Sequence, residues 1–298
     1  MFYTYNYFRQ YNENKEIEDH KEFYKKFSND REFGSGNFSH YDHLIKKRFL
    51  NLYGHTINIF LKKMPKEVLD IGCGAGINLP LSKYFDMTNY TGIDYAEKAL
   101  EHSRTIYPNV AFEVKDAFNL DYNKKFDLAI ISSVLILYKE EEDRIRLLEN
   151  AKDSIKNDGV IVSIVWKDSW LLKYSIIFSR FIAKIKKIPL PEDFMGIHFS
   201  ETEAKSMFEK SGLEIKEKIH TANLYGALES VRYLNMKKYK RNFGKAEKEF
   251  GESKPQNILE DLENESGSKI LMKIYYFMAT YFPSSLNMYS IYLLEKKN

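Results

Sequence analysis

Short apolar runs alternate along the chain with longer segments in which apolar residues recur every three or four positions. Seven of the runs are rich in β-branched or aromatic residues and end at turn residues, a pattern that is typical of strands. The predicted strands are residues 67–71, 90–94, 110–114, 126–132, 159–165, 213–219 and 288–295. The early runs are continuously apolar rather than alternating, which predicts parallel strands that are covered on both faces.

Helical patterns fall between these strands. We expect helices at residues 95–106, 143–156 and 201–211, and the last of these begins with a capping-box pair, Ser200 and Glu203. Strands that alternate with helices predict an open α/β sheet with right-handed crossovers.

Three segments do not fit this alternation. Residues 1–64 are aromatic and are predicted to be helical at least from 41 to 63, which suggests an N-terminal helical cap. Residues 65–298 are then the main domain, with insertions at about 167–199 and 221–287. Ligands of open α/β sheets bind beyond the carboxyl ends of the strands, so we expect these insertions to fold over that edge as lids.

Composition narrows the class of protein. A chain of 298 residues with 44 % hydrophobic content is long enough for one sizeable core with appendages. The 45 Lys and Arg residues nearly balance the 42 Asp and Glu residues, so no general basic excess favours nucleic acid as a partner. One cysteine permits no intrachain disulfide and fits a reducing compartment.

The sequence pattern predicts neither a secretory signal nor a membrane-spanning helix. The first residues have neither a basic start nor an apolar run, so they do not resemble a secretory signal. The two most apolar stretches, 170–188 and 270–282, contain lysine or arginine and are too short for spanning helices. These observations predict a cytoplasmic protein.

Glycines follow the first predicted strand. Gly72, Gly74 and Gly76 lack a Cβ atom and therefore permit a tight turn and a close approach of backbone to a ligand. A dinucleotide fingerprint requires a further glycine where this chain has Ile77, and a phosphate-binding P-loop requires a Gly-Lys-Ser/Thr sequence that is missing here. A plain glycine-rich strand–helix turn is the alternative interpretation.

Carboxylates lie near the predicted carboxyl edge of the sheet. Asp70 and Asp94 belong to the ends of the first two strands, and Asp116 follows the third. A carboxylate at the position of Asp94 can accept hydrogen bonds from both hydroxyls of a ribose. Several carboxylates together repel a pyrophosphate and favour a ligand with cationic groups. Asp94 and Asp116 could instead be turn or N-cap residues, and we interpret Asp127, at a strand start, as structural.

A family resemblance follows from these motifs. The stretches "VLDIGCGAG", "GIDYAEKAL", "VKDAF", "FDLAIISSVLIL" and "IKNDGVIVSIVW" together resemble the class I S-adenosylmethionine (SAM)-dependent methyltransferases, in particular small-molecule and lipid enzymes related to the ubiquinone and menaquinone methyltransferases. The resemblance is strong over about 65–165 and weak over 200–220 and 285–298. It implies a Rossmann-like α/β fold: a seven-stranded, mostly parallel sheet with helices on both faces and an antiparallel last strand.

The resemblance also implies the cofactor and its contacts with the methionine portion. SAM would be bound and S-adenosylhomocysteine released, with no metal expected. Gly72 and Gly74 would lie against the methionine portion, and Asp70 would act near its ammonium group, directly or through water. Ser132 and Ser133, at the end of the fourth strand, would line the same portion or have a structural role only.

The nucleoside half of SAM would meet a second group of residues. Asp94 would bind the ribose hydroxyls, with Tyr95 beside the adenine or ribose. Asp116 would accept a hydrogen bond from the adenine amino group, and Ala117 would supply backbone contacts.

The carboxylate of SAM also needs donors. Helix N–H groups after the glycine loop could supply them. His43, Lys47 or Arg48 could add charge, although a solvated helix face is the favoured interpretation of these three.

Methyl transfer needs an aligned acceptor and exclusion of water, and a base helps when the acceptor is a hydroxyl. Many relatives place a histidine where this chain has Leu137. The candidate catalytic residues are therefore Tyr138, which could instead be a packing residue, and His198, which could instead mark a helix entry. His220 and Tyr225 are weaker candidates.

The favoured hypothesis is an enzyme that methylates oxygen or nitrogen of a small-molecule acceptor, with no nucleic acid as partner. A methyltransferase for RNA or protein is an alternative because of the basic run Lys237–Lys248, which glutamates dilute. A non-catalytic SAM-binding protein and, more distantly, an NAD-linked enzyme are further alternatives. The apolar, basic-edged stretch at 170–188 is interpreted as a lid or as a surface for an amphiphilic substrate or membrane. The oligomeric state is left open.

Overall fold

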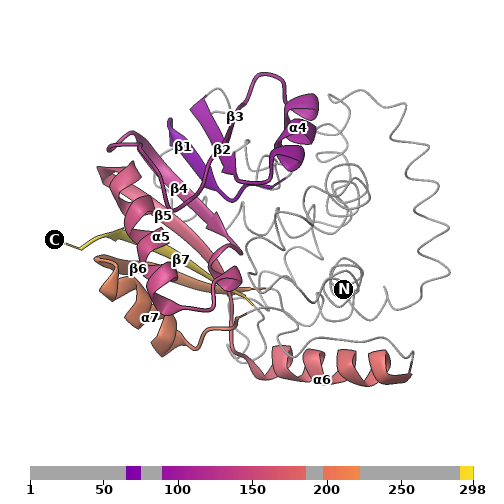
Figure 1. Ribbon diagram of the computed structural model, residues 1–298. Helices are drawn as coiled ribbons and strands as arrows, with labels where there is room; N and C mark the ends of the chain where they lie inside the picture. The colour runs from indigo at the N-terminus through magenta and orange to yellow at the C-terminus, as the bar shows by residue number, and fades with distance from the viewer. Residues whose placement is uncertain (1–64, 75–88, 186–196, 222–288, 298) are drawn as a thin grey trace, which may run out of the picture.

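The computed structural model describes residues 65–74, 89–185, 197–221 and 289–297 (Figure 1). The predicted N-terminal cap at 1–64 lies outside these residues, as does nearly all of the insertion at 221–287. Within the described residues, no helix is both long and apolar enough to cross a membrane.

Seven strands form a single mixed sheet in the order β3-β2-β1-β4-β5-β7-β6. Every pairing among β1 to β5 is parallel, whereas β7 is antiparallel to both of its neighbours, β5 and β6. This arrangement confirms the predicted Rossmann-like α/β sheet with an antiparallel last strand. The strands are β1 (Val68–Ile71), β2 (Tyr90–Asp94), β3 (Ala111–Val114), β4 (Phe126–Ser132), β5 (Ile155–Trp166), β6 (Leu213–Thr221) and β7 (Tyr289–Lys296).

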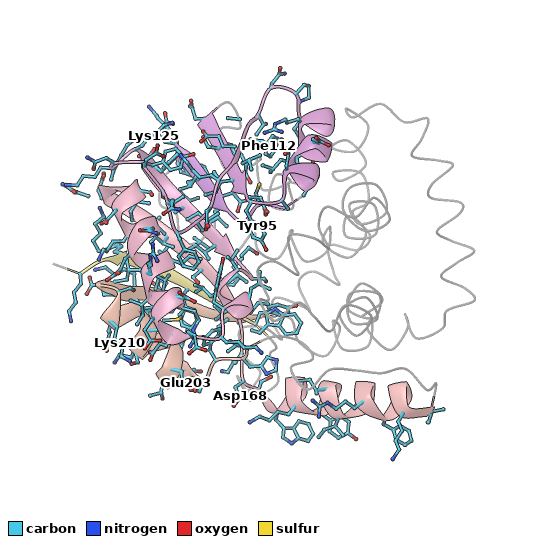
Figure 2. All side chains as sticks on the ribbon, in the orientation of Figure 1. Tyr95, Phe112, Lys125, Asp168, Glu203 and Lys210 are labelled. Atoms are coloured by element: carbon cyan, nitrogen blue, oxygen red, sulfur yellow. The ribbon has the colours of Figure 1, made fainter. Side chains whose placement is uncertain are left out.

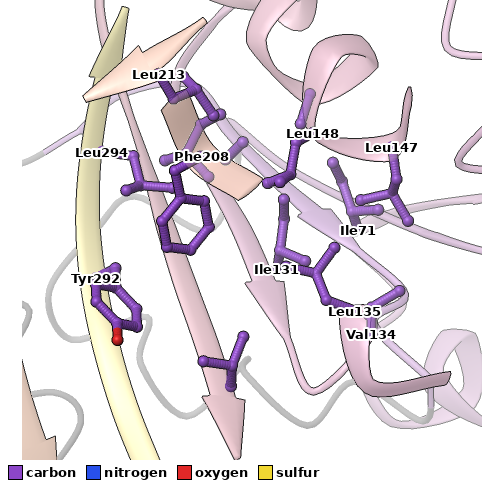
Figure 3. Packing of buried hydrophobic residues seen from close by; sticks show 14 of the residues in the cluster. Ile71, Ile131, Val134, Leu135, Leu147, Leu148, Phe208, Leu213, Tyr292 and Leu294 are labelled. Atoms are coloured by element: carbon purple, nitrogen blue, oxygen red, sulfur yellow. The ribbon is translucent and has the colours of Figure 1, made fainter. Parts of the chain in front are cut away.

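Helices cover both faces of the sheet. The helical elements that the structure describes are α4 (Glu97–Ile106), the short 3₁₀ helix η3 (Leu135–Leu137), α5 (Glu141–Ser154), α6 (Trp170–Ile185) and α7 (Glu201–Lys210). On one face, α5 and α7 contribute buried residues such as Leu148 and Phe208 to a core that includes Ile131 and Leu294 of the sheet (Figure 3). On the other face, Leu100 of α4 joins a second core. In contrast, α6 extends away from the sheet (Figure 1).

The boundary between α5 and β5 differs from the prediction. The pattern predicted a helix over 143–156 and a strand over 159–165, but α5 ends at Ser154 and β5 begins at Ile155. Ile155 is buried and pairs with Phe126 of β4, and the register shifts directly after that pair. Gly159 makes the irregular strand possible, because a Cβ atom there would lie 3.0 Å from the carbonyl oxygen of Phe126.

The start of α7 confirms the predicted capping box. The Glu203 backbone N–H donates to Ser200 Oγ over 3.2 Å, and the Ser200 N–H donates to Glu203 Oε2 over 2.8 Å. These two bonds satisfy donors that the first turn of a helix otherwise leaves without partners. They therefore fix the point at which the chain enters α7.

Candidate functional site

The order of the strands reverses between β1 and β4, which lie side by side at the centre of the sheet. Open α/β sheets bind ligands beyond the carboxyl ends of the strands at such a switch point. The loop after β1 folds over the end of β2, since the N–H groups of Gly72 and Cys73 both donate to the carbonyl oxygen of Ile93, over 2.9 and 3.0 Å. The glycine loop and the end of β2 therefore form one connected edge.

Gly72 is required at its position for two separate reasons. Its φ angle is +70°, in the left-handed region that side chains rarely adopt. A Cβ atom on Gly72 would also lie 2.5 Å from Cγ2 of Val134, two residues after β4. The missing side chain thus lets the loop after β1 pack against the turn after β4, directly at the switch point.

The turn after β4 has an unusual backbone of its own. Ser133 has a φ angle of +59°, and its N–H donates to the carbonyl oxygen of Ile164 in β5 over 3.0 Å. A non-glycine residue in this conformation needs support from the surrounding structure, and such residues cluster at functional sites. Ser132 and Ser133 are both half-buried beside the glycine loop. Their predicted contact with the methionine portion of a ligand stays a prediction.

Asp94 lies at the end of β2 and is 4 % exposed. One of its oxygens, Oδ2, accepts the N–H of Gly74, and the other, Oδ1, accepts the N–H of Ala96, each over 2.9 Å. Burial raises the pKa of the Asp94 carboxyl, although hydrogen bonds from the backbone of Ala96, Gly74 and Tyr95 act in the opposite direction. A carboxylate has about four acceptor positions in all, so Asp94 can still accept a further donor such as a ribose hydroxyl.

Asp70 has a different environment. It is fully buried in β1, and its Oδ2 accepts the phenol O–H of Tyr90, which begins β2. Burial, followed by the nearby Asp70 charge, raises the pKa of Tyr90 well above its ordinary value, so the phenol keeps its proton and remains a donor. The pair joins β1 to β2 below the glycine loop. The predicted role of Asp70 near the ammonium group of a ligand is not tested by this geometry.

Cys73 fills space between the loop and the sheet. A Cβ atom on Gly92 would lie 2.8 Å from Cys73 Sγ, so the thiol occupies the room that this glycine leaves. Burial first, and then the charges of Asp70 and Asp94, raise the pKa of the thiol well above its ordinary value. A protonated, buried thiol is a poor nucleophile, so Cys73 acts as a small filler beside the sheet.

The turn after β3 contains Asp116 and Ala117. Asp116 Oδ1 accepts the N–H of Phe118 over 3.0 Å, and the Asp116 carbonyl oxygen accepts the N–H of Asn119 over 2.9 Å. The Ala117 carbonyl oxygen accepts Nδ2 of Asn150 in α5 over 3.1 Å. Asp116 thus has the turn role that the sequence left open, and its predicted contact with adenine stays a prediction.

Tyr95 directly follows Asp94 and is half-buried. In Figure 2 its label lies near the carboxyl end of β2. Its predicted place beside the adenine or ribose of a ligand also stays a prediction.

The two catalytic candidates lie in different surroundings. Tyr138 is buried, and its ring makes an edge-to-face contact with Phe118 at 5.1 Å between centroids, as expected for a packing residue. His198 is half-buried, and its ring stacks on Trp166, at the end of β5, with the centroids 6.3 Å apart. Hydrogen bonds from Ile197 N–H to the Ile136 carbonyl oxygen and from Phe199 N–H to the Trp166 carbonyl oxygen fix the strand-like segment 197–199 beside this edge.

Arg144 is a residue that no sequence motif singles out. Its Nη1 donates to the carbonyl oxygens of Tyr138 and Lys139, each over 2.6 Å, and its guanidinium lies 5.4 Å from the centre of the Phe199 ring. It thereby connects α5 to the loop after η3 and to the segment that carries His198. Such contacts have no local sequence signal, because the acceptors are backbone carbonyls.

Asp127 lies at the opposite end of the sheet, where β4 begins. Its Oδ2 accepts the N–H groups of Lys66 and Glu67, over 3.0 and 2.9 Å, and its Oδ1 pairs with Lys156 Nζ at 2.7 Å. Although burial raises the pKa of Asp127, these three donors together lower it below its ordinary value. The structural interpretation of Asp127 is therefore confirmed.

Other candidates lie outside the described residues: His43, Lys47, Arg48, Gly76, Ile77, Tyr225 and the basic run Lys237–Lys248. For His220 the structure describes the backbone, in β6, but not the side chain.

Comparisons with known proteins add a family match to this geometry. Residues 68–159 match the family model described as a methyltransferase domain. Over 93 residues the chain is 32 % identical to protein 235L of Invertebrate iridescent virus 6, which is assigned as a methyltransferase. That alignment covers 31 % of this chain and 32 % of the viral protein, so the chain spans about a third of the length of this relative.

Solved structures with a similar fold include a SAM-dependent methyltransferase from Methanosarcina mazei, which is 23 % identical with a TM-score of 0.45, over 56 % of this chain and 89 % of that one. A SAM-dependent methyltransferase from Leishmania major is 12 % identical with a TM-score of 0.48, over 83 % of this chain and 72 % of that one.

Proposed function

We propose that this chain, whose residues 68–159 match a methyltransferase domain, is an enzyme that transfers the methyl group of SAM to oxygen or nitrogen of a small-molecule acceptor. The observation that supports this most is the geometry of Asp94. A buried carboxylate at the end of β2, held in place by the N–H groups of Gly74 and Ala96, supports a role as the acceptor for a ribose hydroxyl.

The residues at the carboxyl edge fit SAM in their chemistry. Asp94 would bind the ribose hydroxyls, with Tyr95 and Asp116 toward the adenine and Ala117 beside it. The glycine loop would lie against the methionine portion. Gly72 has no side chain to fill the space beside Val134, so the backbone of the loop stays close to the turn after β4. The buried charge of Asp70 adds negative potential below the loop, which suits a cationic ligand better than a phosphate.

Protonation of Asp94 provides a test of this fit. The pKa of Asp94 is raised above its ordinary value of 3.8, and a protonated carboxyl loses the acceptor position that a ribose hydroxyl needs. We therefore expect SAM affinity to fall on acidification at a higher pH than for an ordinary aspartate. Titration calorimetry at a series of pH values measures this, and a flat affinity profile down to the unfolding pH would contradict the role of Asp94.

When bound, SAM supplies a methyl group on a sulfonium, which is a good leaving group. The protein then has to orient the acceptor in line with the departing sulfur and exclude water from the edge. The fixed turn at Ser133 and the rigid packing of Gly72 on Val134 support such an orientation, because both restrict the backbone beside the reacting position. A base is needed only where the acceptor is a hydroxyl.

His198 is our candidate for that base, and Tyr138 is a weaker one. The stacking of His198 on Trp166 supports this choice, because it orients the imidazole at the end of β5. We expect His198→Ala to lower kcat by about 100-fold or more on a hydroxyl acceptor while SAM affinity changes little. Tyr138→Phe is the matched comparison and should leave kcat nearly unchanged if Tyr138 only packs on Phe118. Equal activity of the wild type and His198→Ala would remove His198 from the mechanism.

The acceptor class can be tested without knowing the acceptor. Purified protein is incubated with methyl-labelled SAM and with separate small-molecule, RNA and protein fractions of a cell extract. The proposal predicts label in the small-molecule fraction, dependent on Asp94 and absent with Asp94→Ala. Label in RNA or protein alone would instead support the alternative that the basic run Lys237–Lys248 favours, and label in no fraction would support a SAM-binding protein without activity.

The proposal includes three further statements. A cytoplasmic location fits the single cysteine, Cys73, which is buried as a thiol. Nucleic acid is not the expected partner, because the overall charge of the chain is only +3. The N-terminal residues 1–64 and the insertion at 221–287 are proposed to cover the ligand as a cap and a lid.

A further inference from the structure

The helix α6 presents a row of large apolar side chains to solvent. Five residues along it are exposed: Trp170 at 63 %, Tyr174 at 59 %, Ile177 at 65 %, Phe181 at 58 % and Ile185 at 63 %. They are spaced four, three, four and four positions apart, so they lie on one face of the helix. Apolar rows of this kind are normally buried against a core, and a contiguous exposed patch marks an interaction surface.

Positive charge borders the same face. Lys173, Arg180 and Lys184 are exposed, and the 16 residues of α6 contain no acid. At about 100° per residue, all three cations fall along one edge of the apolar row rather than opposite it. Lys173 also pairs with Asp168, just before the helix, at 2.9 Å. Asp168 thus balances part of the charge at the start of the helix, and Arg180 and Lys184 make the edge basic toward its end.

Aromatic residues are concentrated at one end of the row. Trp170 and Tyr174 stack with their ring centres 5.4 Å apart, next to Lys173. Tryptophan and tyrosine favour the boundary between water and hydrocarbon, because their rings are apolar and their N–H or O–H groups remain hydrated. This end of α6 has the composition of an interfacial anchor.

We propose that α6 docks on an anionic membrane surface, with its apolar row in the interface and its three cations toward the lipid headgroups. A helix of 16 residues with three cations is too short and too charged to span a bilayer, but it matches a helix that lies in the interface plane. A second copy of α6 is a poor occupant, since it would bring three more cations and no acid. The inference goes beyond the proposed function, because docking does not require methyl transfer.

Docking would also affect where the candidate site lies. α6 begins shortly after β5 ends at Trp166, the residue on which His198 stacks. A membrane-bound α6 would therefore keep this edge of the sheet close to the bilayer.

The test uses the full-length protein and vesicles of phosphatidylcholine, with or without about a quarter phosphatidylserine. Co-sedimentation should show binding to the anionic vesicles, weaker binding to neutral vesicles and a loss of binding at high salt. Ile177→Glu or Phe181→Glu should each weaken the binding by about tenfold or more, because each places a charge in the apolar row. Arg180→Ala should weaken binding to anionic vesicles by about fivefold.

The matched control is Lys205→Ala on α7, which lowers the net charge by one, as Ile177→Glu does, at an exposed position away from α6. This control should bind as the wild type does. A second readout uses Trp166→Phe, which leaves Trp170 as the only tryptophan of the chain. Its emission should shift to shorter wavelength when anionic vesicles are added.

Three results would overturn the proposal. The first is no binding of the wild type to anionic vesicles; short-wavelength emission of Trp170 in Trp166→Phe in buffer would then show that another part of the chain covers the row. The second is wild-type binding by Ile177→Glu. The third is a dimer in solution that Ile177→Glu converts to a monomer without any vesicle binding, since a second copy then covers the face.

Discussion

Replacement of Gly72 by alanine tests how the two turns at the switch point depend on each other. At a φ angle of +70°, an L-residue costs about 1–2 kcal/mol relative to glycine. The new Cβ would lie 2.5 Å from Val134 Cγ2, against about 3.5–4.0 Å for a relaxed contact, and overpacking of this kind costs about 1–3 kcal/mol more. We therefore expect Gly72→Ala to lower the free energy of unfolding by about 2–5 kcal/mol.

Gly212→Ala is the matched control for the backbone part of this cost. Gly212 has a φ angle of +74°, but a Cβ there would meet only the flexible end of Lys152, at 2.9 Å from Nζ. It should therefore lose about 1–2 kcal/mol. Urea unfolding followed by far-ultraviolet circular dichroism compares both variants with the wild type.

A double-mutant cycle then isolates the contact with Val134. Val134→Ala removes the methyl group that the new Cβ would meet, so Gly72→Ala should cost about 1–3 kcal/mol less in that background. Two outcomes would refute the reasoning: equal losses for Gly72→Ala and Gly212→Ala, or strictly additive effects of Gly72→Ala and Val134→Ala.

Three further predictions concern stability. Ser200→Ala should lower the free energy of unfolding by about 1 kcal/mol. The hydrogen bonds with Ser200 lower the pKa of Glu203 below 4.5 in the folded protein, so they stabilise the fold above pH 4.5. This stabilisation is lost as the pH falls through the folded-state pKa, and Ser200→Ala should remove it. Asp127→Asn should cost about 1–3 kcal/mol at neutral pH, and because the folded-state pKa is lowered from 3.8, the difference from the wild type should shrink as the pH falls below that value. Tyr90→Phe should cost about 1–3 kcal/mol, since it removes a donor from the buried Asp70 carboxylate. Urea titrations between acid and neutral pH measure all three, and wild-type stability at neutral pH would contradict each assignment.

The central strands were predictable because their sequence signals are local. Residues 90–94 and 126–132 were expected as strands and form β2 and β4 with the same bounds. The end of α5 was predicted two residues too late, because Ile155 continues the helical spacing of apolar residues. Its pairing with Phe126, 29 positions away, decides the outcome, and no local pattern reports such a contact.

In the candidate site, too, residues with a local sequence signal were predictable and residues that depend on long-range contacts were not. Gly72 and Asp94 could be selected from the sequence because each directly follows or ends a strand that leads to the carboxyl edge. Tyr90 and Arg144 could not, since Tyr90 binds a carboxylate in another strand and Arg144 binds backbone carbonyls. The apolar character of α6 was visible in the sequence, whereas its exposure was not, because a periodic apolar row normally predicts burial.

SAM binding by the Asp94→Ala variant tests the central claim most directly. Titration calorimetry should show binding of SAM to the wild type and a loss of about 1–3 kcal/mol in Asp94→Ala, because the ribose hydroxyls lose their acceptor. Asp127→Ala is the control, since it also removes a carboxylate that accepts two backbone N–H groups, but at the opposite end of the sheet. It should lower stability and leave the SAM affinity unchanged. No binding of SAM by the folded wild type, or equal affinity in Asp94→Ala, would contradict the account.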